Sequence, residues 1–178
     1  MNLAKEDFYC GAFLSFLLNN KIVPALFEER VNSSRKIYDF TTDKGGFRVY
    51  VKGSEKPSSE SQLKKSSIWN FPFTEKQIDE IKGIESEEKQ MYFAFVCGKI
   101  PLNKSRIAVI PADILFQCID IDRSDKYKSQ SVKIKLVKGC WDFEVYGTAR
   151  ADRINGLDNT LKVRVKNIDE LFSKEVMV

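Results

Sequence analysis

The feature that most constrains the fold is a pair of short apolar runs in the middle of the chain, Gln90–Cys97 and Arg106–Ile110. Their length and their content of Phe, Val and Ile favour strands over helices. A strand that is apolar on both sides must be covered on both faces, so these runs predict the central strands of a covered sheet. With 178 residues, 43% of them hydrophobic, the chain can bury such a core as one domain.

Other segments alternate between helical and strand patterns. Apolar spacing and end signals predict helices over residues 4–19, 74–84 and 111–119, and a closing helical turn over 168–172. Strand patterns cover residues 23–29, 36–42, 47–52, 68–73, 131–137, 140–146 and 161–165. This order predicts an α/β (α+β) fold, in which residues 1–178 form a single domain with a mixed sheet of about seven to eight strands flanked by helices.

The chain contains no histidine. This excludes a catalytic triad, a histidine base and histidine metal ligands, so enzymatic chemistry would depend on carboxylates, lysines, tyrosines or cysteines. Three of the four cysteines, Cys10, Cys97 and Cys118, lie in apolar runs and are expected to be buried free thiols, which fits a reducing cytoplasm.

The apolar run Phe8–Leu18 is too short to span a bilayer, and no membrane partner is expected.

The segment 37–52 is expected to form a β-hairpin about a four-residue turn, residues 43–46. In that register Asp39 lies opposite Tyr50, and the side chains alternate between two faces. One face is apolar, and the other brings an acid and a lysine together; this second face holds Asp39, Thr41, Arg48, Tyr50 and Lys52. The alternative is that these polar side chains form the solvated face of an ordinary amphipathic ribbon.

This arrangement resembles the restriction-endonuclease-like, or PD-(D/E)xK, superfamily. Its members have a helix with a glutamate, then a hairpin with a metal-binding Asp on one strand and (D/E)-x-K on the next, then a helix and further strands. On that pattern Glu6 corresponds to the helix glutamate, Asp39 to the hairpin Asp, and Lys52 to the lysine. The resemblance covers residues 4–120 and leaves a C-terminal β-rich extension, residues 131–166.

The resemblance implies a Mg²⁺-dependent nuclease in which Asp39 is a metal ligand and Lys52 steadies the attacking water. The sequence departs from the pattern because Tyr50 stands where the second acid belongs, and Tyr is a poor metal ligand at neutral pH. Glu28, Glu29 or Glu75 could supply that acid instead. The catalytic candidates are therefore Asp39, Lys52, Glu6 and Glu28.

The net charge of +4 is compatible with nucleic acid as a partner. The residues expected to contact a phosphate backbone are Arg48, Lys56, Lys64, Lys65, Lys162, Arg164 and Lys166; the alternative is scattered surface charge. A second hairpin about Lys138-Gly139 pairs its strand lysines with acids, Lys133 with Glu144 and Lys135 with Asp142. It also places Trp141 opposite Leu136 on the apolar face. The aromatic residues Trp69, Phe71 and Phe73 could stack on bases, but a core position is expected.

Two functions remain open. The first is a nucleic-acid-associated protein resembling a Mg²⁺-dependent endonuclease, with its activity intact or degenerate. The second is a non-enzymatic module that binds DNA, RNA or a protein, and a second copy of the chain is one such protein partner. A cofactor other than Mg²⁺ is not expected.

Overall fold

The computed structural model describes residues 2–29, 37–84, 89–122, 129–150 and 160–165, with the backbone alone for 26–29. The predicted turn at 168–172 lies outside these ranges. The described helices are α1 (Lys5–Asn19), α2 (Glu75–Ile84), α3 (Ala112–Cys118) and the short 3-10 helix η1 (Leu102–Lys104). The three predicted helices are thus confirmed within a residue at each end, and the mixed α/β class is confirmed with them.

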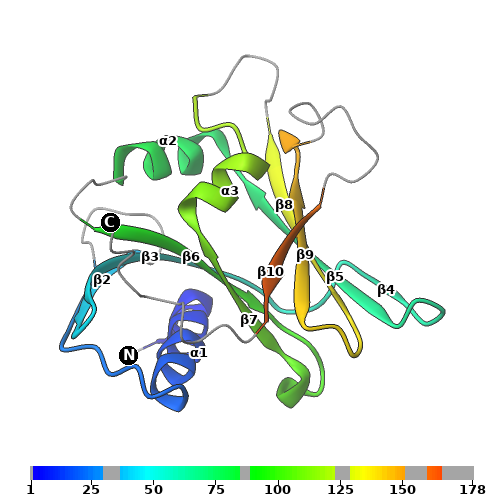
Figure 1. Ribbon diagram of the computed structural model, residues 1–178, viewed down its shortest axis with the longest axis horizontal. Coiled ribbons are helices and arrows are strands. Elements are labelled where there is room, and N and C mark those ends of the chain that lie inside the picture. The colour runs from blue at the N-terminus through cyan, green and yellow to red at the C-terminus, as the bar shows by residue number, and fades with distance from the viewer. Residues whose placement is uncertain (1, 30–36, 85–88, 123–128, 151–159, 166–178) are drawn as a thin grey trace, which may run out of the picture.

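The strands form two five-stranded sheets rather than one (Figure 1). The first, sheet A, has the order β1 (Leu26–Glu29), β2 (Ile37–Thr42), β3 (Gly45–Ser54), β6 (Gln90–Cys97) and β7 (Arg106–Pro111). The second, sheet B, has the order β10 (Leu161–Arg164), β9 (Asp142–Gly147), β8 (Gln130–Val137), β5 (Ser66–Phe73) and β4 (Ser59–Ser61). Only β3 and β6 pair in parallel, and every other described pairing is antiparallel.

The parallel pairing of β3 with β6 requires a long crossover. The crossover contains β4, β5 and α2. In the sequence, two strands of sheet B therefore come between β3 and β6, which are neighbours in sheet A. Strand β5 pairs with β8 along its whole length, from Ser66 opposite Val137 to Phe73 opposite Gln130. Strands from residues 4–120 and strands β8, β9 and β10 of the expected C-terminal extension therefore share sheet B.

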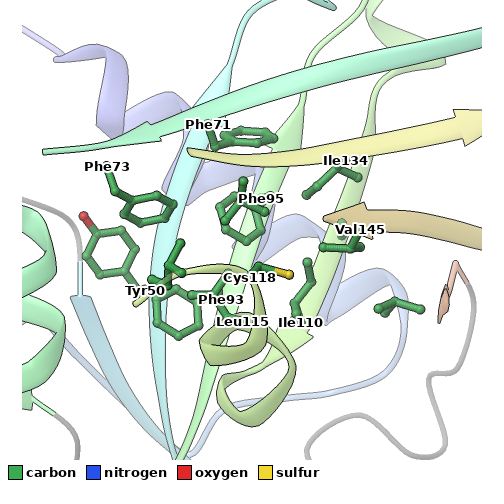
Figure 2. Close-up of a cluster of buried hydrophobic side chains, with 14 of the residues drawn as sticks. Tyr50, Phe71, Phe73, Phe93, Phe95, Ile110, Leu115, Cys118, Ile134 and Val145 are labelled. Carbon is green, nitrogen blue, oxygen red and sulfur yellow. The ribbon is translucent and has the colours of Figure 1, made fainter. Parts of the chain in front are cut away.

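Sheet A is covered on both faces, as the apolar runs predict. Helix α1 packs Phe13 and Leu17 on one face, in a cluster with residues of β2, β3 and β6. Sheet B, α2 and α3 cover the other face, where the buried ring of Phe95 lies 4.7 Å from that of Phe71, centroid to centroid (Figure 2). Strand β6 is buried from Met91 to Cys97 because it lies between these layers.

Local chemistry explains where α2 begins. Thr74 precedes the helix, its hydroxyl accepts a hydrogen bond from Gln77 N at 3.3 Å, and Gln77 Oε1 accepts one from Thr74 N at 3.1 Å. This reciprocal pair satisfies two backbone donors that the helix itself cannot bond. Thr74 is therefore the N-cap of α2. The predicted core position of Trp69, Phe71 and Phe73 is also confirmed, because all three are 1% exposed.

Candidate functional site

The hairpin β2–β3 has a different register from the predicted one. The turn is two residues long, Asp43-Lys44, and Gly45, with a positive φ of 134°, pairs with Thr42. Asp39 therefore lies opposite Arg48, and Tyr50 lies opposite Ile37. The register is shifted by two residues, so the side chains keep their predicted faces but change their partners.

Asp39 is held by two cations. The guanidinium of Arg48 donates to both carboxylate oxygens, at 2.8 Å from Nε and 2.9 Å from Nη2, and Lys89 Nζ donates at 2.7 Å. Burial of the carboxyl raises its pKa, but the hydrogen bonds and charges of Arg48 and Lys89 outweigh it and lower the pKa to about 2. Arg48 also donates to the carbonyl oxygen of Ile84 in α2 at 2.5 Å. The group predicted to bind Mg²⁺ thus forms ion pairs that join the hairpin to the crossover.

Lys52 and Tyr50 do not join Asp39 in a common site. Lys52 Nζ donates to Gln77 Oε1 at 3.2 Å and lies 4.7 Å from the centroid of the Phe73 ring. Tyr50 is fully buried, with its ring 5.6 Å from that of Phe93, and is part of the core shown in Figure 2. The predicted register, which brought Asp39 close to Lys52, was wrong. The shorter turn places Asp39 opposite Arg48, farther along the hairpin from Lys52.

The other acidic candidates are spread over the fold. Glu6 lies on α1, which covers the opposite face of sheet A from Asp39 and Lys52. Glu75 begins α2. The Cα atoms of Glu28 and Glu29 pair with those of Asp39 and Tyr38 across β1 and β2. Within the described part of the chain, no group of three or more Cys, Asp or Glu side chains could hold a metal ion.

The thiols offer no nucleophile in the core. Cys10, Cys97 and Cys118 are buried thiols outside any disulfide, as predicted, whereas Cys140 is exposed. Burial raises the pKa of the Cys97 thiol far above its ordinary value, so the sulfur stays protonated.

The predicted phosphate contacts fall into three groups. Arg48 is 8% exposed and bonded to Asp39, so its prediction as a phosphate contact was wrong. On sheet B, Lys162 pairs with Glu144 at 2.9 Å and Arg164 with Asp142 at 3.4 Å. Lys56, Lys64 and Lys65 are exposed and form no ion pair among the described residues, although Lys56 helps to lower the pKa of the nearby Glu55. Lys166 lies outside the described residues.

The second hairpin shows the same kind of shift. Lys135 lies opposite Glu144, not Asp142, and their ion pair is 2.7 Å long. Lys133 lies opposite Tyr146, not Glu144, with Nζ 5.7 Å from the ring centroid. Strand β9 begins only at Asp142, so Trp141 is in the turn and 67% exposed instead of pairing with Leu136.

Hydrogen bonds join four turns in two pairs, residues 54–58 with 98–105 and residues 62–65 with 138–141, and we call these turns the basic end. Gly98 N donates to Ser54 O at 2.7 Å, and its own carbonyl accepts from Trp69 Nε1 at 2.7 Å. Lys138 N donates to Lys65 O at 2.8 Å. In Figure 1 the turns that follow β4, β6 and β8 lie along the lower right of the view.

Glycine is required at position 98. A Cβ there would lie 2.5 Å from the carbonyl oxygens of both Ser54 and Glu55, a distance that real Cβ atoms do not reach. The absence of a side chain lets the β6–β7 connection lie directly against the turn that leaves β3.

The charge of the basic end is one-sided. Its one acid, Glu55, is paired with Lys5 at 2.7 Å, and Glu60 in the adjoining β4 is paired with Lys99. These two lysines lower the pKa of the two carboxyls. Five exposed lysines form no ion pair within the described ranges: Lys56, Lys64, Lys65, Lys104 and Lys138. The charges of Lys56 and Lys104 still act on the carboxyls of Glu55 and Glu60 and help to lower their pKa. The basic end can therefore attract an anionic polymer.

Exposed apolar side chains lie among these lysines. Leu63 is 93% exposed, Ile100 83%, Leu102 81% and Trp141 67%, and they make up half of the eight large hydrophobic residues that are exposed in the described ranges. Local patterns did not predict their exposure, and they placed Trp141 on the apolar face of a hairpin, because the position of each turn depends on the assembly of both sheets.

The comparisons with known proteins add no family. No family model matches the chain, and no curated protein or solved structure is significantly similar to it. None of the helices in the described ranges has the length and apolar character needed to cross a membrane.

Proposed function

We propose that this chain is a non-enzymatic nucleic-acid-binding protein that contacts the phosphate backbone with its basic end. The observation that carries the proposal is that five lysines without an ion pair are exposed on neighbouring turns, while the nearby Glu55 and Glu60 are paired with Lys5 and Lys99. These lysines are Lys56, Lys64, Lys65, Lys104 and Lys138. Lysines that bind the phosphates of a polyanion release its counterions. The carboxylate of Asp39, in contrast, is occupied by Arg48 and Lys89, which disfavours its use as a metal ligand.

Binding of labelled single- and double-stranded oligonucleotides, measured by fluorescence anisotropy over a range of salt concentrations, tests the proposal. The affinity should fall steeply as salt rises, and the triple variant K64E/K65E/K138E should lose most of it. Loss of three phosphate contacts should reduce the steepness of log K against log[salt] by about two for a single strand and somewhat more for a duplex. The matched control K21E/K44E/K76E changes the charge equally at exposed lysines elsewhere, and it should keep most of the affinity.

Divalent-metal nuclease activity is the second candidate. It is favoured by the pairing of the Glu28 Cα with that of Asp39, which places two acids at one level of sheet A. Nicking of supercoiled plasmid in Mg²⁺ or Mn²⁺, compared between the wild type, Asp39→Asn and Glu28→Gln, tests it. Cleavage lost in both variants supports the nuclease, whereas binding without cleavage under either metal supports the first proposal alone.

A further inference from the structure

The proposed function concerns phosphates and leaves the exposed apolar side chains of the basic end without a role. Trp141 lies at the tip of the β8–β9 hairpin, next to Lys138 and Cys140 in the same turn. Its main-chain oxygen accepts a hydrogen bond from Val165 N at 2.8 Å, and Lys138 N is bonded to Lys65 O. Two main-chain hydrogen bonds thus fix the turn that bears the indole, yet two thirds of the Trp141 surface is exposed to solvent.

We infer that the basic end binds single-stranded nucleic acid and that Trp141 stacks on an unpaired base while the surrounding lysines contact the phosphates. This inference rests on the proposed function and names the form of nucleic acid that it takes. An aromatic ring with cations beside it is the combination that single-strand-binding surfaces use, because every base has a π-face. Leu63, Ile100 and Leu102 extend the apolar surface around the lysines.

A single strand fits these side chains better than a duplex. In a duplex the faces of the bases are covered by their neighbours, so an indole can reach them only after base steps are unstacked at a cost in free energy. A single strand presents the same faces without that cost. The basic end therefore has apolar groups that a duplex leaves unused and that a single strand covers.

An anionic bilayer is the alternative partner for turns that carry both exposed apolar residues and lysines. At two tips a lysine directly adjoins the apolar residue, in Leu63-Lys64 and Lys99-Ile100. Lys99 is also bonded to Glu60 and Ser67 at the base of its turn. Burial of these tips in hydrocarbon would bring the ammonium groups toward it, which is unfavourable. Stacking on a base leaves the ammonium groups outside the stack, at the phosphates.

The test compares the wild type with Trp141→Ala, Trp141→Leu and Trp141→Phe on three probes. The probes are a short poly-dT strand, an abasic strand of equal length and a duplex of equal length. Removal of a base stack costs roughly five- to one-hundred-fold in affinity, which is the loss expected for the Ala and Leu variants on poly-dT. The Phe variant keeps a ring and should lose less. Since Trp69 is buried, quenching of the intrinsic fluorescence on binding reports on Trp141.

The abasic strand separates stacking from charge. It keeps the phosphates but has no bases, so the wild type should bind it about as weakly as Trp141→Ala binds poly-dT, and Trp141→Ala should not distinguish the two strands. Equal affinity of the wild type and Trp141→Ala for poly-dT would overturn the inference and leave the proposed function standing. The proposed function itself fails if the wild type binds no strand at low salt. Capture by phosphatidylserine vesicles that depends on Trp141, without a Trp141 effect on poly-dT, would assign the surface to membranes and overturn the inference.

Discussion

Asp39 and Arg48 lie directly opposite each other in the β2–β3 hairpin and form a two-point ion pair, with N–O distances of 2.8 and 2.9 Å. Their side chains are 13% and 10% exposed, so the pair is largely shielded from water. Lys89 and the carbonyl oxygen of Ile84 complete the set of partners. These contacts indicate that the polar face of the hairpin stabilises the fold.

Replacement of Asp39 by Asn should destabilise the fold by about 2–4 kcal/mol, because it leaves the shielded guanidinium of Arg48 without its counter-charge. Urea denaturation followed by circular dichroism measures the loss. Asp43→Asn, in the exposed turn of the same hairpin, is the matched control and should change the free energy of unfolding by less than about 0.5 kcal/mol. Equal effects of the two variants would contradict a structural role for the ion pair.

Stability should also depend on pH through Asp39. The pKa of this carboxyl falls from its ordinary value of 3.8 to about 2 in the folded state, so the folded state favours the charged form. The stabilisation is therefore complete above the unfolded pKa and is lost as the pH falls from about 5 to about 2. The free energies of unfolding of the wild type and Asp39→Asn, measured across this range, should converge toward the acid end. A constant difference would contradict the prediction.

Gly98→Ala should be destabilising by about 1–3 kcal/mol, because its Cβ would meet two main-chain oxygens that cannot rotate away. Gly83→Ala is the control. Gly83 lies in α2 with open space around it, so the added methyl group should be neutral or stabilise the helix by up to about 1 kcal/mol. Thermal melting of both variants decides the matter; a melting temperature of Gly98→Ala equal to that of the wild type would rule out the close approach.

The native protein should expose a single reactive thiol. Cys140 is exposed, whereas burial protects Cys10, Cys97 and Cys118. Titration with a thiol-specific reagent should show one fast equivalent in the folded protein, and three more only after denaturation. Cys140→Ser should remove the fast phase, and a fast phase that survives in this variant would show that the core admits the reagent.

The sequence predicts elements and faces well, but it does not predict partners. Alternation in the first hairpin places Tyr38, Phe40, Val49 and Val51 on one face, and the structure confirms this because all four pack in the α1 cluster. A slip of two residues preserves every face and exchanges every cross-strand neighbour. The residue opposite Asp39 thus changes from Tyr50 to Arg48, and with it the chemistry of the site.

Local sequence patterns also did not predict that the strands divide into two sheets. Strand β5 pairs with β8, which begins 57 residues after the end of β5, and nothing in the alternation of either strand specifies that choice. Trp141 illustrates the same difficulty on a smaller scale. A two-residue turn and the longer turn actually formed both accommodate Lys138-Gly139, but only the longer turn leaves the indole in solvent.

Because β4 and β5 of sheet B lie in the connection between β3 and β6 of sheet A, the protein cannot be divided into two independent parts along its sequence. A chain that stops at residue 120 would keep all five strands of sheet A but would leave β5 without β8, and Trp69 and Phe71 without the strand that helps to cover them. Since sheet B needs strands from both sides of residue 120 and covers one face of sheet A, we expect the molecule to fold and unfold as one unit and not to tolerate this truncation.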